Sequence, residues 1–237
     1  AVATRVAGRW SGAVGAASAV AAAVPPVILL LAGADGESST SSFTWLPAGE
    51  GLEVGLQLDG LSAAMTATVG AVGAVVLVYA AGYFAGHARG ASARAGLLAF
   101  LAAMQGLVLA DGYLTLLVFW EIVGALSARL IAFSREDPAA PAGAVRAFLT
   151  TRAADVGLYL AVLALFAATG SLAFGDERPD GTLGALVGVG LVVAAMGKSA
   201  QAPLQTWLAG AMAGPTPVSA LLHSATMVAA GVYLLMR

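Results

Sequence analysis

The chain has 237 residues, of which 59% are hydrophobic and 10% are charged, with a net charge of −2 and no cysteine. Soluble domains carry about 25% charged and about 45–50% apolar residues, so this composition predicts a polytopic helical membrane protein and excludes an ordinary soluble domain. The negative net charge argues against a nucleic-acid partner, and the lack of cysteine excludes disulfides, thiolate metal sites and cysteine-ligated iron–sulfur clusters.

Apolar runs divided by glycine, proline and charged residues predict about seven membrane spans. In chain order they cover residues 12–31, 61–85, 94–110, 113–133, 144–168, 183–202 and 219–236. A polar loop at 32–60 follows the first span, and the alternation in LEVGLQL predicts a short strand or hairpin within it. A tight ADG turn joins the third and fourth spans. The expected fold class is therefore all-α, a transmembrane helical bundle.

Residues 197–219, GKSAQAPLQTWLAGAMAGPTPVS, interrupt helical regularity twice, at Pro203 and at Pro215 and Pro217. Proline removes a backbone donor and clashes with the preceding turn, so one helix is expected to be discontinuous. Backbone groups freed at membrane depth are tolerated where they line a cavity or bind an ion, with a kinked but inert helix as the alternative. Lys198 comes five residues before the first of these prolines.

Basic residues predict the orientation. If successive loops alternate sides, one side holds Arg5, Arg9, Arg89, Arg94, Arg135 and Arg146, whereas the loops of the other side hold only Arg178. That other side carries Asp35, Glu37, Glu50, Glu53, Asp111, Asp176, Glu177 and Asp180. Because basic loops stay in the cytoplasm, we expect a cytoplasmic N-terminus and an outward-facing loop at 32–60, in the bacterial inner membrane.

Five ionisable residues lie inside predicted spans: Glu121, Arg129, Arg152, Asp155 and Lys198. A charge near a helix centre costs about 2.5–3.5 kcal/mol on insertion scales, so such residues face the bundle interior and usually mark an ion or proton path. Structural alternatives stay open: Glu121 as the partner of a buried cation, and Lys198 and Arg129 as side chains that reach the interface. Arg152 and Asp155 are three residues apart near the cytoplasmic end of their span, so they can form an ion pair, either structural or part of a relay.

Proton transfer is the chemistry that these side chains can perform. Burial in a low dielectric favours the neutral form of a carboxyl or an amine, and a nearby opposite charge favours the ionised form. A buried glutamate–lysine couple would therefore hold or release a proton as its separation changes. His223 is a candidate next station because imidazole titrates near neutral pH, with a hydrogen-bonded core histidine as the alternative. His87 lies in a loop and is expected to be solvated. No cofactor or metal is expected in this chain.

Several segments resemble one family. GKSAQAPLQTWLAGAMAGPTPVSALLHSATMVAAGVYLL resembles the signature of the large antiporter-like membrane subunit of respiratory complex I, an NADH-quinone oxidoreductase, called subunit L in bacteria and subunit 5 in mitochondria. LADGYLTLLVFWEIVGALSARLIAF and AFLTTRAADVGLYLAVLALF resemble its adjoining helices, and FTWLPAGEGLEVGLQLDGLSAAM resembles its early outward-facing hairpin. The likeness is collinear over nearly the whole chain. The A subunit of Mrp-type Na⁺/H⁺ antiporters belongs to the same superfamily, and PLQTWL favours the complex I branch.

The resemblance implies a proton-translocating subunit, a translocase component with no redox site of its own, that assembles with other membrane subunits of complex I in the lipid bilayer. It implies that Glu121, in the WE helix, pairs with Lys198 of GKSAQ, and that His223 continues the hydrophilic axis. Arg152 and Asp155 match the family's TRxxDV motif. Quinone reduction elsewhere in the complex would drive the couple open and shut. The alternative is a cation/proton antiporter subunit, and a third class is a non-transporting scaffold.

The chain also departs from the family pattern. AVATRVAGRW resembles the loop after the family's first helix, and VYLLMR stands where the family continues into a second, inverted repeat with a further lysine. We therefore expect an N-terminal span and hairpin loop at 1–60, two early spans at 61–111, and the first half of an antiporter-like domain at 112–237. Gly210 replaces a common aspartate, and Arg129 replaces an apolar residue. This chain alone is expected not to complete a proton path.

Overall fold

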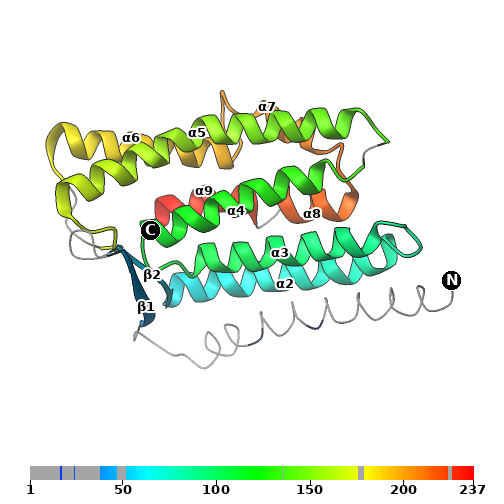
Figure 1. The fold of residues 1–237 in the computed structure, drawn as a ribbon, viewed down its shortest axis with the longest axis horizontal. Helices are drawn as coiled ribbons and strands as arrows, with labels where there is room; N and C mark the ends of the chain where they lie inside the picture. The colour runs from blue at the N-terminus through cyan, green and yellow to red at the C-terminus, as the bar shows by residue number, and fades with distance from the viewer. Residues whose placement is uncertain are drawn as a thin grey trace.

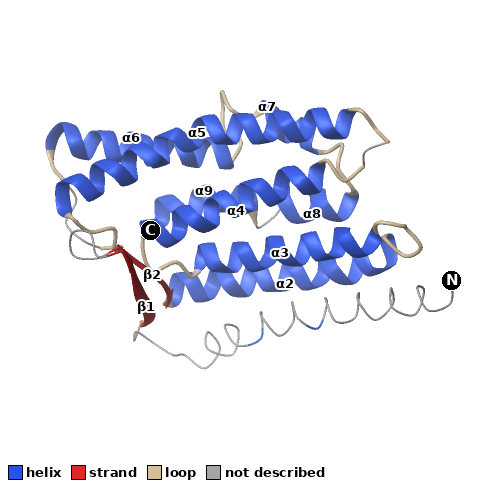
Figure 2. Ribbon diagram, viewed as in Figure 1, coloured by secondary structure: helices blue, strands red, loops and turns tan. Residues whose placement is uncertain are grey.

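The computed structural model describes residues 38–46, 52–134, 136–175, 179–223 and 226–237, together with positions 17 and 24. Within these residues a two-stranded hairpin precedes a set of helices (Figure 1). The elements are β1 (Ser39–Leu46), β2 (Leu52–Leu58), α2 (Gly60–Tyr83), α3 (Gly90–Val108), α4 (Tyr113–Ile131), α5 (Ala139–Thr169), α6 (Gly181–Lys198), α7 (Thr206–Ala211), α8 (Thr216–His223) and α9 (Met227–Met236). Helix dominates, and loops are confined to the ends of the bundle and to the breaks around α7 and α8 (Figure 2).

Six stretches of the described chain are long and apolar enough to cross a membrane, and they confirm the expected transmembrane bundle. Five are the single helices α2 to α6, and the sixth, Thr216–Met236, contains α8 and α9. The predicted first span, at 12–31, lies outside the described residues apart from positions 17 and 24. The helices lie side by side, with α2 against α3, α3 against α4, α5 against α6, and α6 against α9.

The predicted hairpin is confirmed and is bonded to the bundle. Strand β2 coincides with LEVGLQL and pairs with β1 in antiparallel register, from Ser39 opposite Leu58 to Thr44 opposite Glu53. The amide of Gln57 donates to the carbonyl oxygen of Leu109 at 2.6 Å, which joins β2 to the turn between α3 and α4. That turn is the predicted ADG segment, and it holds the hairpin at one end of the spans.

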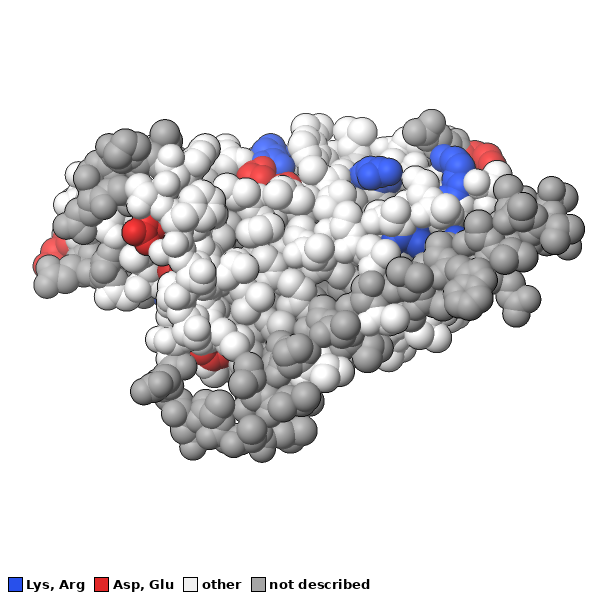
Figure 3. All heavy atoms as spheres, turned by 60° about the horizontal axis from the view of Figure 1, so that its bottom comes forward, with Lys and Arg blue, Asp and Glu red and all other residues white. Residues whose placement is uncertain are grey.

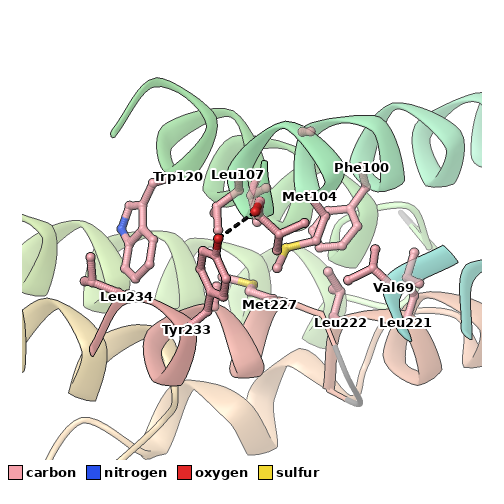
Figure 4. Close-up of a cluster of buried hydrophobic side chains, with 14 of the residues drawn as sticks. Val69, Phe100, Met104, Leu107, Trp120, Leu221, Leu222, Met227, Tyr233 and Leu234 are labelled. Carbon is pink, nitrogen blue, oxygen red and sulfur yellow. Dashed lines mark hydrogen bonds between the residues drawn. The ribbon is translucent and has the colours of Figure 1, made fainter. Parts of the chain in front are cut away.

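The core lies between the early helices and the last two. Figure 4 shows side chains of α3, α4, α8 and α9 meeting there, among them Met104, Trp120 and Met227. The Tyr233 hydroxyl donates to the carbonyl oxygen of Val108 at 2.6 Å, so this tyrosine has a polar partner although its ring is buried. Because a buried hydroxyl without a partner is costly, this bond fixes α9 against the end of α3.

The broken region differs in detail from the prediction. The sixth span was expected to reach residue 202, but α6 ends at Lys198 and Pro203 lies outside any helix, since the residue before a proline is disfavoured in the α conformation. The final span was expected as one helix over 219–236, but α8 begins at Thr216, where Pro217 fits a first turn, and it ends at His223 before α9 begins at Met227.

Charges of the described residues separate along the bundle. The end with the α2–α3 turn carries Arg89, Arg94, Arg129 and Arg146, with Glu136 and Asp137. The hairpin end carries Glu53, Asp59, Asp111 and Asp180, with Arg237. Figure 3 shows most of the basic side chains of the visible face gathered toward the end opposite the hairpin. We refer to these as the basic end and the hairpin end.

Candidate functional site

Lys198 is the last residue of α6, and its side chain is fully buried. The helix stops there because Ala200 adopts a left-handed backbone conformation, with φ of 51°, and Pro203 follows. The last carbonyl groups of a helix carry partial negative charge, so its C-terminus favours a cation. The broken helix thus places the chain's single lysine at a helix end that stabilises the ammonium group.

Asp155 of α5 is the carboxylate that faces this ammonium. Lys198 Nζ lies 3.3 Å from Asp155 Oδ2, and both side chains are fully buried. Trp120 of α4 donates its indole N–H to Asp155 Oδ1 at 2.6 Å, and its ring centroid lies 5.0 Å from Lys198 Nζ. Helices α5 and α6 approach closely here because Gly197 of α6 packs on Ala154 of α5 without a Cβ of its own. The pair is therefore enclosed by three helices.

Glu121 pairs with a different cation. Its carboxylate forms an ion pair with Arg152 of α5, and both side chains are 28% exposed. The Tyr159 hydroxyl accepts a hydrogen bond from Arg152 Nη1 at 2.7 Å and donates one to Glu121 Oε1 at 2.7 Å. The same Arg152 nitrogen lies 3.9 Å from Asp155 Oδ2. The four charges therefore alternate in the order Glu121, Arg152, Asp155, Lys198, and we call them the four-charge chain.

Two expectations from the sequence need correction. The structure does not bring Glu121 into contact with Lys198. Glu121 pairs with Arg152 and accepts a hydrogen bond from Tyr159, whereas the ammonium group of Lys198 pairs with Asp155. The predicted ion pair between Arg152 and Asp155 is confirmed. These two residues were expected near one end of their span, but they lie near the middle of α5, because the helix begins at Ala139, five residues earlier than expected.

Gly124, one turn after Glu121 on α4, makes room for both cations. A Cβ at this position would lie 3.1 Å from Lys198 Nζ and 3.6 Å from Arg152 Nη2. Its missing side chain therefore lets the lysine and the arginine approach the α4 backbone together. This close approach explains why a glycine is compatible with the otherwise bulky sequence of α4.

His223 lies at the end of α8, close to the lysine's helix but not bonded to it. Its ring centroid is 6.2 Å from that of Trp207, and Trp207 donates its indole N–H to the carbonyl oxygen of Gly197 at 2.9 Å. Both ring nitrogens of His223 are buried and have no hydrogen-bond partner in the part of the chain that the structure describes. The histidine is thus placed next to the segment that carries Lys198, through Trp207.

The other residues singled out from the sequence lie away from the four-charge chain. Arg129 is exposed in the last turn of α4 and donates to the Ser92 hydroxyl at 3.4 Å, in accord with a side chain that reaches the interface. Gly210 of α7 packs against Gly143 of α5. His87 is exposed, as expected. Pro203 is exposed, whereas Pro215 and Pro217 are buried around the start of α8.

Sequence reasoning missed the aromatic residues that connect the charges. Trp120 directly precedes Glu121, and Tyr159 lies seven residues after Arg152 and four after Asp155. Residues spaced by three, four and seven share one face of a helix, so Tyr159 could have been found from its spacing. Trp120 carried no such signal. It bonds to Asp155, whereas the adjacent Glu121 pairs with Arg152.

Fold and site together define an antiporter-like membrane subunit with a broken helix and buried charges. The family model described as "NADH:quinone oxidoreductase/Mrp antiporter, TM" matches residues 110–237, more than half of the chain, and the chain belongs to this family. A second model, "NADH-Ubiquinone oxidoreductase (complex I), chain 5 N-terminus", matches residues 45–92. The resemblance drawn from the sequence is confirmed.

Relatives from two branches agree with this assignment. NADH-quinone oxidoreductase subunit L of Escherichia coli is 42% identical over 251 residues, which cover 97% of this chain and 40% of that protein. The Mycobacterium tuberculosis subunit L is 41% identical over 240 residues, 96% of this chain and 38% of its own. The structure of an Mrp complex from Dietzia sp. DQ12-45-1b matches with a TM-score of 0.86 and 35% identity, covering 98% of this chain and 26% of that one. The chain spans about two fifths of the length of these two subunit L relatives.

Proposed function

We propose that the chain forms the first half of a proton-translocating module in an NADH:quinone oxidoreductase, driven by quinone reduction elsewhere in the complex. The observation that carries this proposal is the fully buried pair of Lys198 and Asp155, connected through Arg152 to the partly exposed Glu121. Ionisable groups are rare inside membrane spans and usually belong to an ion or proton path. A structural ion pair would not need a connection to the surface of the bundle.

Three residues of the four-charge chain can bind and release a proton, and the fourth, Arg152, cannot. Arginine stays protonated in proteins, so Arg152 changes the local field only by moving between Glu121 and Asp155. When Arg152 moves toward Glu121, Asp155 depends on Lys198 alone and holds the ammonium more firmly. When Arg152 moves toward Asp155, the hold on Lys198 weakens, and the lysine can pass its proton on. Coulomb energies of several kcal/mol at these distances make such a small motion effective.

His223 is the proposed next acceptor. An imidazole can both take and give a proton, and the His223 ring lies beside Trp207, which is bonded to the carbonyl of Gly197 next to the lysine. We infer that Glu121, Lys198 and His223 exchange the proton, with Arg152 and Asp155 controlling the exchange. The breaks at Pro203 and at Pro215 and Pro217 give the segment between α6 and α8 its own short helix, α7, and thus room to move.

The same proposal includes partners and orientation. The relatives are named as subunits of an NADH-quinone oxidoreductase or belong to an Mrp complex, so we infer that this chain assembles with other membrane subunits in a bacterial inner membrane. The concentration of arginine at the basic end supports a cytoplasmic location for that end and an outward-facing hairpin. No cofactor is assigned to the chain, since redox groups would belong to other subunits.

The second candidate is an Mrp-type cation/proton antiporter subunit, which the likeness to the Mrp complex favours. The two functions differ in what drives the proton. Vesicles containing the full complex would show proton uptake coupled to NADH oxidation in the first case. In the second case, proton movement would follow an imposed Na⁺ gradient and would not respond to NADH.

Substitution of Lys198 in the full complex tests the proposal. Lys198→Ala is expected to lower the number of protons pumped per NADH oxidised, because the carboxylate of Asp155 loses the proton carrier that faces it. Arg146→Ala is the matched control, because it removes an exposed cation near the basic end. Wild-type pumping per NADH in the Lys198→Ala complex, with assembly intact, would rule out the proposed role of the lysine.

A further inference from the structure

A second polar site lies at the basic end of the bundle, away from the four-charge chain. A cavity of about 200 Å³ opens there between the end of α2 with its following turn, the segment after α4, and the start of α8. Its lining includes Tyr83, His87, Arg89, Phe133, Ser134 and Glu136. None of these residues takes part in the proposed proton path, so the cavity needs a separate explanation.

Two opposite charges line this cavity without pairing with each other. Arg89 and Glu136 both border it, and neither forms an ion pair with another residue of the described chain. The Arg89 guanidinium lies over the ring of Phe133, 4.9 Å from its centroid, and its N–H groups donate no hydrogen bond within the part of the chain that the structure describes. Within the described residues, one cation and one carboxylate of this small cavity thus have no ion-pair partner, which matches a ligand that carries both charges.

Hydrogen-bonding and aromatic groups complete the cavity. His87 and Ser134 add donors beside Arg89, and an arginine fork with neighbouring donors is well suited to phosphate. The Tyr83 ring stacks on His87 with centroids 6.3 Å apart, and a cavity lined by an aromatic ring and a carboxylate is well suited to an ammonium group. The volume lies below the range typical of drug-sized ligands, which favours a small headgroup.

The surface of α2 shows how the rest of such a ligand would lie. Val75, Tyr79 and Tyr83 are spaced by four residues on one face of the helix and are 71%, 52% and 39% exposed. They form an apolar stripe along a predicted membrane span that ends at the cavity. Because these side chains are exposed among the described residues, an acyl chain can follow the stripe while its headgroup enters the cavity. A free phosphate ion would make no use of the stripe.

We propose that this cavity binds the headgroup of a zwitterionic phospholipid of the phosphoethanolamine class. The phosphate lies against Arg89, with His87 and Ser134 as further donors, and the ammonium lies against Glu136 and Tyr83. A purely anionic lipid would satisfy Arg89 but would bring a second negative charge next to Glu136. This site is independent of the proposed proton path and stands whether or not that proposal holds.

Lipid competition in the full complex tests the site. The purified, delipidated complex is reconstituted with equal amounts of phosphatidylethanolamine and phosphatidylglycerol, and the retained lipid is measured by native mass spectrometry. We expect the wild type to retain phosphatidylethanolamine preferentially. Arg89→Gln is expected to weaken its binding about tenfold, as for the loss of a hydrogen bond to a charged group. Glu136→Gln is expected to abolish the preference over phosphatidylglycerol while lipid is still retained.

Two control variants distinguish the loss of a charge in the cavity from the loss of a surface charge elsewhere. Arg146→Gln and Asp137→Asn each remove one exposed charge near the basic end, outside the cavity lining, and should leave lipid retention unchanged. Equal retention by wild type and Arg89→Gln, or an unchanged preference in Glu136→Gln, would overturn the proposal. Displacement of the lipid by millimolar inorganic phosphate would assign the cavity to free phosphate and would also overturn it.

Discussion

Asp155 is the residue on which the buried network depends, because it contacts three partners from three positions in the chain. It accepts the Trp120 indole N–H, faces the Lys198 ammonium, and lies within ion-pair distance of Arg152. The sequence could identify Asp155 and Arg152 as a pair from their spacing, since both lie on one helix. It could not show that Asp155 faces Lys198, because that contact depends on how α5 and α6 cross.

Neutralising Asp155 should cost more stability than neutralising Glu121. In Asp155→Asn the amide can still accept the Trp120 N–H, but Lys198 is left buried without a carboxylate, and breaking such a pair costs about 3–5 kcal/mol. Glu121→Gln is the matched control, because its partly exposed pair contributes about 1 kcal/mol or less. Thermal unfolding of the purified complex would measure both. Equal midpoints for the two variants would contradict a central role for Asp155.

The Tyr159 hydroxyl is expected to hold Arg152 near Glu121. Tyr159→Phe removes one hydrogen bond from Arg152 and one to Glu121, worth about 1.5–3 kcal/mol each when a charged group is involved. We therefore expect a several-fold slower initial rate of proton uptake in vesicles at an unchanged rate of assembly. Tyr79→Phe, on the exposed face of α2, is the control. An unchanged rate in Tyr159→Phe would remove this residue from the path.

At the scale of elements, α9 is fixed at both ends, and one end lies next to the lysine. The Ser199 hydroxyl, directly after Lys198, donates to the Val228 carbonyl oxygen at 2.7 Å near the start of α9. At the hairpin end, Arg237 after α9 forms an ion pair with Asp59, the N-cap of α2. The position of α9 therefore connects the hairpin end of the bundle with the end of α6.

The ion pair of Asp59 and Arg237 should be insensitive to pH across the physiological range. Partial burial opposes ionisation of Asp59, but hydrogen bonds from Arg237 and Ser62 outweigh it and hold the pKa of this carboxyl below its ordinary value of 3.8. For Arg237, burial is likewise outweighed by its bonds to Asp59 and Tyr233, and its pKa is raised. A lowered carboxyl pKa contributes stability that is present above 3.8 and is lost only as the pH falls below it.

Hydrogen exchange of the α9 amides tests this ion pair. Wild-type protection should not change between pH 5 and 8 once the intrinsic exchange rate is corrected, because pH 5 already lies about one unit above the ordinary aspartate pKa of about 3.9. Asp59→Asn should lower protection throughout that range, although asparagine can still cap α2. Asp180→Asn, at an exposed N-cap without a side-chain hydrogen bond, is the control. Unchanged protection in Asp59→Asn would show that the ion pair does not hold α9.

Element by element, the predictions succeeded where the sequence pattern is local. The apolar runs gave the spans, and the alternation in LEVGLQL gave β2, because burial in lipid and strand pairing act on short stretches. The breaks at Pro203 and Pro215 follow from proline chemistry. The non-helical Thr226 before α9 had no such signal, since no proline or glycine lies between Pro217 and Thr226 in the sequence.

At the scale of the whole molecule, the separation of charge supports a defined orientation, and membership of the family supports the broken-helix architecture. The functional conclusion depends on contacts that cross between helices: Glu121 to Arg152, and Asp155 to Lys198. The sequence identified these four residues by their place inside apolar spans and by the family motifs, and only the structure gave their order. In that order Glu121 and Lys198 are the two ends of the four-charge chain, although their side chains do not touch.

A double-mutant comparison in the full complex shows whether Glu121 and Lys198 act in one proton path. Protons pumped per NADH are measured for Glu121→Gln, Lys198→Ala and the two combined. If the residues act in one path, the double variant loses no more than the more severe single variant, because residues that act as a unit are strongly non-additive. If the two losses multiply in the double variant, Glu121 and Lys198 act independently, and the four-charge chain is not the route of the proton.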